Sequence, residues 1–272
     1  MTVSGSLLLV GCGKMGGAML RGWLQRGVRG GDVAVVEPNA APIRDLAAHG
    51  VRLIDDAAKV PLDFSPAVVV IAVKPQMTDA ALPGYRRFAR PETVFLSIAA
   101  GRTIAYFERH FGATAAIVRS MPNTPAAVGR GITVACPNSK VTPSQRALCD
   151  ELLAAVGEVA WIADEGMLDA VTAVSGGGPA YVFLLIECLA EAAAAAGLPA
   201  DLAMRLARVT VSGAGELARQ SPEPAAVLRQ NVTSPAGTTL EALKILMAPD
   251  GLQPLLTKAI AAATRRSREL AG

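Results

Sequence analysis

Three glycines near the start of the chain have the spacing of a phosphate-binding turn. In VGCGKMGGAML, Gly11, Gly13 and Gly16 match G-x-G-x-x-G, directly after an apolar run and at the opening of a helical pattern. Glycine at these positions permits a tight turn, close approach of the backbone to a pyrophosphate, and close packing of helix on strand. Free N–H groups and the helix dipole would then hold the phosphates. The motif predicts a dinucleotide site, against the plainer interpretation of a glycine turn without a ligand.

An acidic residue follows at the distance that this motif requires. Glu37 ends the second predicted strand, where a carboxylate contacts the adenine ribose of a bound dinucleotide. It can accept hydrogen bonds from the ribose hydroxyls of NADH, but it would repel the 2′-phosphate of NADPH. Arg44, a little further on, could partly offset that repulsion. We expect NADH or NADPH as the cofactor, with NADH favoured.

Three more segments are candidates for the cofactor crevice, because ligands of open α/β sheets bind outside the carboxyl ends of the strands. AVKPQ (72–76) and SIAAG (97–101) end predicted strands, and RSMPNTP (119–125) follows the next one. Lys74 is either a ligand contact or a solvated surface lysine, and the loop at Asn123 either covers the crevice or is a rigid connector. The candidate cofactor contacts are Gly11, Gly13, Lys14, Met15, Gly16, Glu37, Ala72, Val73, Lys74, Pro75, Ala99, Ala100, Gly101, Pro122 and Asn123.

A second group of small and hydroxyl side chains lies far along the chain, in NVTSPAGTTLEAL (231–243). Nothing in it titrates near neutral pH. Its hydroxyls either cap the helix that follows or bind an anion together with the free N–H groups of the helix start. On pattern alone the capping turn is favoured. In VSGGGPAYVF (174–183), the three glycines are either a hinge between helices or a helix start that faces an anion or packs closely.

The elements that must position these residues change character along the chain. Up to residue 163, apolar β-branched runs alternate with helical patterns, which indicates a parallel sheet covered on both faces. The predicted strands are 6–11, 33–38, 51–54, 67–75, 93–101, 115–125, 131–138 and 157–164. Beyond them only helices are predicted, at 165–174, 179–196, 199–219, 224–230, 238–247 and 252–270. We predict an α/β fold, with a Rossmann-type NAD(P)-binding domain at 1–163 and an all-helical domain at 164–272.

Composition limits the function classes. Of the 272 residues, 51% are hydrophobic and 18% charged, so a sizeable core is available and disorder is not expected. The net charge of +3 is too small to indicate nucleic-acid binding. Much of the apolar share is alanine, which favours helices that pack closely, also between subunits.

Other residue types point to a soluble chain. The four cysteines are scattered and there are only two histidines, so we expect reduced thiols, no metal site and no Ser-His-Asp triad. No signal sequence is recognisable. The longest apolar stretch contains Glu187 and Glu191, which argues against a membrane span. A cytoplasmic protein without membrane partners is expected.

Taken together, VGCGKMGGAML, AVKPQ, SIAAG, RSMPNTP, SGGGPAY and NVTSPAGTTLEAL resemble pyrroline-5-carboxylate reductase, in this order over nearly the whole chain. The last segment resembles the signature of that family and is the most specific; the glycine motif is the least. The resemblance implies an oxidoreductase that reduces 1-pyrroline-5-carboxylate to L-proline with NADH or NADPH, the last step of proline biosynthesis. It also implies a Rossmann domain followed by a helical domain of the 6-phosphogluconate dehydrogenase C-terminal type. That helical domain interlocks with a second subunit, giving a homodimer or a ring of dimers.

The resemblance further implies the site residues. Ser234 and Thr239 match the substrate-contacting serine and threonine of the family and are expected to be catalytic. The implied substrate contacts are Thr233, Ser234, Ala236, Gly237, Thr238 and Thr239. Glu37 departs from the family, because many members carry serine or a similar residue there and use NADPH readily, which leaves the cofactor preference open.

The lack of a titrating residue is compatible with this chemistry. The substrate is a cyclic imine with a carboxylate, and a protonated imine accepts hydride without a strong protein acid. The site must anchor the carboxylate and hold the imine carbon close to the hydride donor. Thr239 could bond the ring nitrogen or relay a proton from water.

Two other functions agree less well with the sequence. A 3-hydroxyacid dehydrogenase of the 6-phosphogluconate dehydrogenase type needs a lysine on the long helix of the second domain to take the proton from an alcohol. Residues 179–196 contain none, and Lys244 and Lys258 lie in later helices. A non-catalytic dinucleotide sensor would need no second pocket, which the intact TSPAGTT segment argues against.

Overall fold

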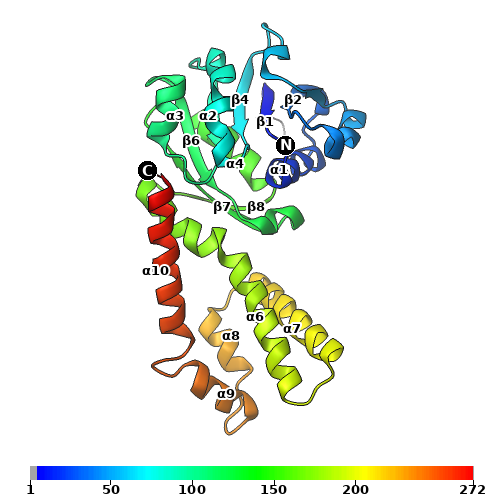
Figure 1. The fold of residues 1–272 in the computed structure, drawn as a ribbon, viewed down its shortest axis with the longest axis vertical. Helices are drawn as coiled ribbons and strands as arrows, with labels where there is room; N and C mark the ends of the chain where they lie inside the picture. The colour runs from blue at the N-terminus through cyan, green and yellow to red at the C-terminus, as the bar shows by residue number, and fades with distance from the viewer. Residues whose placement is uncertain (1–4, 272) are drawn as a thin grey trace. The chain divides into compact units, whose positions relative to one another are not determined.

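The computed structural model describes residues 5–271, in which eight strands form one sheet of order β3-β2-β1-β4-β5-β6-β7-β8 (Figure 1). They are β1 (Ser6–Val10), β2 (Val33–Val36), β3 (Arg52–Ile54), β4 (Pro66–Ile71), β5 (Val94–Ser97), β6 (Ala116–Met121), β7 (Gly131–Pro137) and β8 (Gly157–Trp161). All eight predicted strands are confirmed. The first six are parallel and follow the doubly wound order in which dinucleotides bind at the carboxyl ends.

One pair of strands departs from the prediction of a parallel sheet. β7 runs antiparallel to β6, with Arg119 opposite Cys136. The reason is the connection, a loop with one short 3₁₀ turn, η6 (Thr124–Val128), which is too short for the crossover that a parallel pair requires. β8 returns parallel to β7 after helix α4 (Pro143–Ala154). The sheet is therefore mostly, not wholly, parallel.

Alternate residues of the strands build two cores, one on each face of the sheet. Leu7 and Leu9 of β1 face a core that includes Trp23 of α1 (Lys14–Gln25) and Leu152 of α4. Leu8 and Val10 face the opposite core, which is rich in aromatic residues from η5 (Leu82–Phe88) and α3 (Ile104–Phe111). Each fully buried large apolar side chain stabilises the fold by about 1.5–3 kcal/mol. The two cores hold the strand ends, and thus the crevice, in place.

Several shorter elements complete this part of the chain. The helix predicted after the second strand is a 3₁₀ helix, η2 (Ala41–His49), closed by Gly50 with φ of +82°. Other elements lie where no helix was predicted: η4 (Pro75–Met77), α2 (Thr78–Ala81), η5 and α3, together with the single turns η1 (Gly30–Asp32) and η3 (Ala57–Lys59).

The remaining elements are helical, as predicted. They are η7 (Glu165–Met167), α5 (Leu168–Val171), a π-helical stretch (Thr172–Gly176), α6 (Gly178–Ala195), α7 (Ala200–Gln220), α8 (Ala225–Asn231), α9 (Thr238–Leu246) and α10 (Leu252–Ala271). The glycines at 176–178 do not open a loop between helices: the π-helical stretch runs directly into α6. By length and composition alone, Glu165–Ala195 would be long and apolar enough to cross a membrane, with a mean hydropathy of 1.5 over an 18-residue window. A single helix of this kind is weak grounds for a membrane protein.

The chain divides into two compact units. The first runs to Gly176 and includes the chain from Thr264 onward; the second is Gly177–Ala263. These limits differ from the predicted boundary at 163/164 because the first helical turns pack on the sheet domain, where Leu168 joins Val134 and Cys136 in a small core. The Ser267 hydroxyl donates to Asp169 Oδ1 at 2.6 Å and ties the end of α10 to α5. A cofactor domain at 1–163 and a substrate domain at 164–272 stay a functional prediction.

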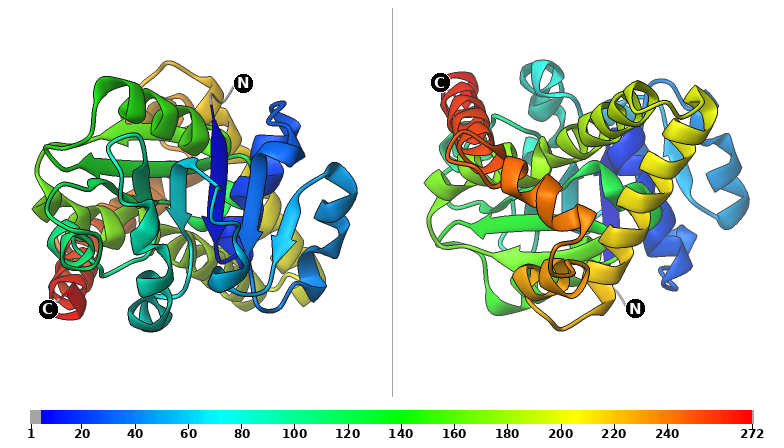
Figure 2. Two further views of the ribbon diagram at one scale, coloured as in Figure 1. Left: turned by 90° about the horizontal axis from the view of Figure 1, so that it is seen from above. Right: turned by 90° about the horizontal axis from the view of Figure 1, so that it is seen from below.

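The second unit has almost no core of its own. Helix α6 packs against α7 (Figures 1 and 2). Yet within residues 177–263 the buried hydrophobic side chains are those of Ala190, Ala203 and Ala207. Large apolar side chains of this unit are exposed, for example Phe183 of α6 (60%) and Ile245 of α9 (75%). A face of this size and character normally marks an interface.

Candidate active site

The glycine loop has the geometry that its sequence predicts. Gly11 has φ of +86°, and a Cβ there would lie 3.0 Å from the Ala72 backbone. A Cβ on Gly16 would lie 2.6 Å from the Gly11 carbonyl oxygen, so α1 could not approach β1 as it does. A Cβ on Gly13, in contrast, would meet nothing within 4 Å. Gly11 and Gly16 thus serve the fold, and Gly13 leaves open space at the helix start.

Helix α1 offers its first N–H groups to a ligand. Its N-cap residue, Gly13, makes no side-chain cap, so the N–H groups of the first turn are available to an anion. Met15 is partly buried and packs against the core. Lys14 is exposed and lines an adjacent depression of about 560 Å³. This cradle fits the pyrophosphate of a dinucleotide.

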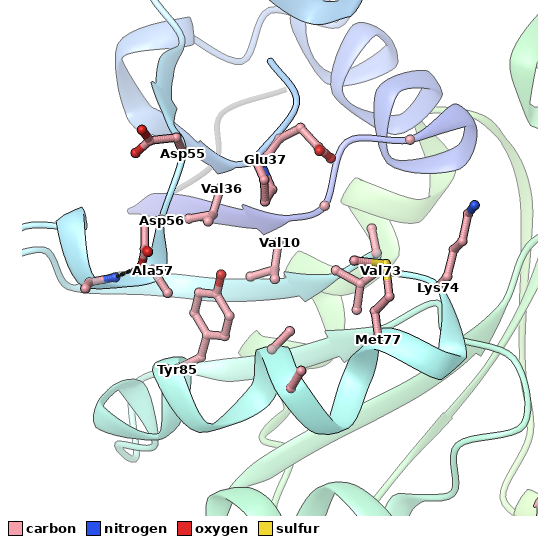
Figure 3. Close-up of a pocket in the computed structure, with 18 of the residues that line it drawn as sticks. Val10, Val36, Glu37, Asp55, Asp56, Ala57, Val73, Lys74, Met77 and Tyr85 are labelled. Carbon is pink, nitrogen blue, oxygen red and sulfur yellow. Dashed lines mark hydrogen bonds between the residues drawn. The ribbon is translucent and has the colours of Figure 1, made fainter. Parts of the chain in front are cut away.

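A cavity of about 680 Å³ lies beside this loop at the carboxyl ends of β1 to β4 (Figure 3). Asp55 and Asp56 lie at one end of it, and Lys74 and Met77 lie at the other. It brings together six of the predicted cofactor contacts, namely Gly11, Gly13, Glu37, Ala72, Val73 and Lys74. Lining residues that were not predicted include Asp55, Asp56, Met77, Tyr85 and Arg87. The two aspartates directly follow β3, so the strand-end rule could have found them.

Glu37 is held in place by two backbone groups. Its Oε2 accepts from the Cys12 N–H at 2.8 Å, and its Oε1 accepts from the Asn39 N–H at 3.1 Å. The carboxylate lines both the cavity and the adjacent depression. Burial, and then the negative charge of Glu37, raise the pKa of the Cys12 thiol to about 11.

The cation beside Glu37 is not the predicted one. Arg21 lines the depression next to Glu37, whereas Arg44 lines neither space. Arg21 is paired with Asp45, at 2.7 Å between Nη1 and Oδ2. Arg44 is absent from both spaces because it lies on the exposed side of η2, whereas its neighbour Ile43 packs into the core.

The other predicted cofactor contacts do not line the cavity. Ala99 is buried, and Gly101 has φ of +71° in the loop after β5. The side chain of Asn123 accepts from the Ile132 N–H at 2.9 Å and so holds the start of β7. Contacts to a cofactor by Pro75, Ala99, Ala100, Gly101, Pro122 and Asn123 stay predictions. Lys74 is exposed, and the structure gives it no partner among residues 5–271.

The TSPAGTT segment opens helix α9 without capping it. The N-cap residue is Gly237, and no side chain bonds the first turn. Ser234 and Thr239 are exposed, and their hydroxyls have no partner in the part of the chain that the structure describes. The Thr233 hydroxyl donates backwards to the Arg229 carbonyl at 2.7 Å. The capping interpretation, which the pattern alone favours, is therefore wrong, and the N–H groups at the start of α9 remain available.

The turn before α9 is unusually tight. Ala236 has φ of +55°, the one non-glycine residue with positive φ among those described. Such a conformation costs about 1–2 kcal/mol in a residue with a Cβ, and positions of this kind cluster at functional sites. A Cβ on Gly237 would overlap Ser234 Oγ, so a larger residue there would displace the Ser234 hydroxyl. The turn thus presents Ser234 beside the helix start.

Comparisons with known proteins agree with this arrangement. Residues 165–270 match the family described as pyrroline-5-carboxylate reductase dimerisation, and residues 6–101 match NADP oxidoreductase, coenzyme F420-dependent. The chain is 37% identical over 266 residues to a pyrroline-5-carboxylate reductase of Pseudomonas aeruginosa, covering 97% of this chain and 96% of the relative.

Solved structures give the same result. A pyrroline-5-carboxylate reductase from Coxiella burnetii superposes with a TM-score of 0.92 at 33% identity, covering 98% of this chain and 99% of the other. A Plasmodium falciparum pyrroline carboxylate reductase with NADP bound superposes with a TM-score of 0.83 at 26% identity over 100% of both chains. With such identity over nearly its full length, the chain belongs to the pyrroline-5-carboxylate reductase family.

Proposed function

We propose that this protein reduces 1-pyrroline-5-carboxylate to L-proline with NADH or NADPH, the last step of proline biosynthesis. The observation that carries the proposal is the uncapped start of α9, with the free hydroxyls of Ser234 and Thr239, in a chain that also has a glycine loop fit for a dinucleotide. The relatives named for this reaction match along nearly the whole chain, both units included.

The residues of the glycine loop would hold the cofactor. The N–H groups at the start of α1 would bind its pyrophosphate, and Glu37 would bind the hydroxyls of its adenine ribose. The bound cofactor supplies the hydride. Because Glu37 is fixed by two backbone N–H groups, it cannot turn away from a 2′-phosphate without losing both bonds. We propose that NADH is preferred.

The hydroxyls and amides of the TSPAGTT segment would hold the substrate. The N–H groups of Thr238 and Thr239 and the Ser234 hydroxyl suit a carboxylate, since a helix start favours negative charge. The remaining predicted contacts, Thr233, Ala236 and Gly237, shape the turn. The Thr239 hydroxyl can then donate to or accept from the ring nitrogen. A protonated imine needs no further acid, so these residues act by fixing the distance and direction of hydride transfer.

The assembly and location are part of the proposal. A second copy of the chain would cover the exposed apolar helices of residues 177–263, giving a homodimer and, by association of dimers, a ring. That cover, rather than a lipid bilayer, accounts for the apolar helix Glu165–Ala195. We propose a cytoplasmic enzyme without metal, membrane or nucleic-acid partners.

The test is a steady-state assay of NADH and NADPH oxidation with 1-pyrroline-5-carboxylate, with L-proline identified by mass spectrometry. We expect turnover that depends on the imine and yields one proline per NAD(P)H consumed. The same preparation is tested in the reverse sense with small 3-hydroxyacids and NAD or NADP. Turnover of a hydroxyacid without turnover of the imine would refute the proposal.

A further inference from the structure

The carbonyl oxygen of Pro75, which opens the turn η4 after β4, is the centre of a polar cluster. The Pro75 oxygen accepts from Arg102 Nη2 at 2.9 Å and from Arg102 Nε at 3.3 Å. It also accepts from the Thr78 hydroxyl at 2.7 Å. Pro75 lies in the loop after β4, and Arg102 directly follows the loop after β5. One side chain thus joins two neighbouring strand-end loops, both of which contain predicted cofactor contacts.

The rest of the cluster holds Arg102 in position. Its Nη2 lies 3.2 Å from Asp79 Oδ2, and its guanidinium lies 4.6 Å from the centre of the Tyr106 ring. The Tyr106 hydroxyl donates to Asp79 Oδ1 at 2.6 Å and lies 2.9 Å from Thr78 Oγ1. Thr78 and Tyr106 are buried, and only about a quarter (26%) of the Arg102 side chain is exposed. Four side chains and one carbonyl therefore form a connected network.

This network lies on the segment that forms one end of the cavity. Lys74 and Met77 line the end of the cavity that lies opposite Asp55 and Asp56 (Figure 3). The bonded carbonyl, that of Pro75, lies between them in the chain. In a doubly wound sheet the adenine half of a dinucleotide lies over the first strands, near Glu37. The end at Lys74 and Met77 is then the one that faces the reactive half.

We propose that Arg102 is a positioning residue for hydride transfer: by holding the Pro75 carbonyl it fixes the loop at Lys74 and Met77, against which the nicotinamide lies. The inference rests on the proposed function and deepens it. Without Arg102 the Pro75 carbonyl loses both guanidinium bonds and keeps those from the hydroxyl and the backbone N–H of Thr78, and the loops after β4 and β5 lose the link through Arg102. The adenosine half, held by Glu37 and the glycine loop, is unaffected. The expected defect is therefore confined to one half of the cofactor.

The experiment compares Arg102→Met with wild type in binding NADH and ADP-ribose, which lacks the nicotinamide, by calorimetry, and in kcat with 1-pyrroline-5-carboxylate. We expect kcat to fall about tenfold and NADH affinity to fall several-fold, since misplacement of reacting groups by fractions of an ångström carries costs of that order. ADP-ribose affinity should stay at the wild-type value. The Arg102→Lys variant, a point donor that can reach one acceptor, should recover part of both losses.

The matched control is Arg109→Met. Arg109 also lies near the Tyr106 ring, at 5.7 Å, and its loss changes the charge equally, but it is exposed and makes no bond to the loop after β4. It should behave as wild type. If Arg102→Met does not fold, Tyr106→Phe tests the same link by releasing Asp79, with a smaller effect in the same direction.

Equal loss of NADH and ADP-ribose binding, or unchanged kcat in Arg102→Met, would overturn the inference. The binding comparison needs no imine. A wild-type protein that fails to reduce 1-pyrroline-5-carboxylate would therefore disprove the proposed function, while the NADH and ADP-ribose affinities would still decide the role of Arg102.

Discussion

At the scale of single residues, what matters is which polar groups are already engaged. The Glu37 carboxylate accepts from two backbone N–H groups, at 2.8 and 3.1 Å, and so is held at the position proposed for the ribose contact. Ser234 and Thr239 present the opposite case, with exposed hydroxyls that bond to nothing among the described residues. A carboxylate held in this way can repel a ligand that carries a negative charge at the same place. A hydroxyl without a partner in the protein is free to form its hydrogen bond with a ligand.

The engaged carboxylate predicts cofactor choice. In Glu37→Ser we expect the ratio of kcat/KM for NADPH to that for NADH to rise at least about tenfold, or about 1.4 kcal/mol, because charge repulsion of the 2′-phosphate is removed. Arg21 and Lys14, which line the adjacent depression, are the cations available to that phosphate. The measurement is steady-state kinetics with both cofactors. Asp32→Ser, which removes a surface carboxylate paired with Arg29, is the control and should leave the ratio unchanged.

The free hydroxyl predicts a different kinetic pattern. Thr239→Ala should lower kcat about tenfold to a hundredfold, because a positioned hydrogen bond to the ring nitrogen is lost. The dissociation constant of NADH, measured by fluorescence, should not change. Ser212→Ala, which removes an exposed hydroxyl on α7 that bonds within its own helix, is the control. Wild-type turnover in Thr239→Ala would remove this residue from the site.

At the scale of elements, two glycines of the loop before α1 have different roles, one in packing and one in ligand binding. Gly16 lies where α1 crosses β1, and a Cβ there would press on the Gly11 carbonyl oxygen at 2.6 Å. Gly13 is exposed, and its Cβ would enter open space beside the first turn of α1. Two glycines three residues apart thus have different physical reasons for being glycine.

This difference can be measured with a pair of variants. Gly16→Ala should destabilise the protein by about 1–3 kcal/mol, as overpacked sites do, and lower its Tm. Gly13→Ala should keep the wild-type Tm, yet weaken ADP-ribose binding about tenfold or more, because the methyl group occupies the position of the pyrophosphate. Thermal unfolding gives the Tm of the two variants, and calorimetry gives their affinity for ADP-ribose. An equal Tm for both would contradict the assignment of Gly16 to packing.

The elements also mark how far the sequence predicts the structure. Eight strands were predicted because buried parallel strands are continuous apolar runs, and the helices after residue 164 were predicted from their period and punctuation. β7 is antiparallel because the loop between β6 and β7 is short. The pattern of apolar residues that predicts a strand contains no information on the direction of that strand. The segments η4 to η5 are short turns that follow one another without clear breaks, so the sequence pattern does not resolve them. Helix α3 does have sequence signals at both ends, the cap residue Thr103 and Gly112, which the strand patterns do not take into account. At α9, hydroxyls beside a helix start predicted a cap, but the N-cap residue is Gly237 and Ala236 before it has positive φ, which the residue pattern does not indicate.

At the scale of the whole molecule, the central fact is a unit without a core. Among residues 177–263 the buried hydrophobic side chains are three alanines, while leucines, valines and a phenylalanine of α6 and α7 are exposed. Helices with apolar residues exposed in this way lack most of the burial that offsets the loss of chain entropy. Since residues 165–270 match a dimerisation family, we expect a second copy of the chain to bury these exposed apolar side chains. Folding of this unit and association of two chains are then one process.

A charge on that face should therefore separate the subunits. We expect wild type to sediment as a dimer or larger, and Phe183→Glu, at a position 60% exposed in the single chain, to shift toward monomer at micromolar concentration. Because a buried glutamate without a partner costs several kcal/mol, association weakens by orders of magnitude. Circular dichroism should show loss of helix in the monomer, since the second unit loses its cover. Leu62→Glu, at a position 86% exposed in the sheet domain, should leave mass and helix content unchanged. A helical, fully folded Phe183→Glu monomer would mean that the second unit is stable alone, and that its apolar face has a purpose other than holding two chains together.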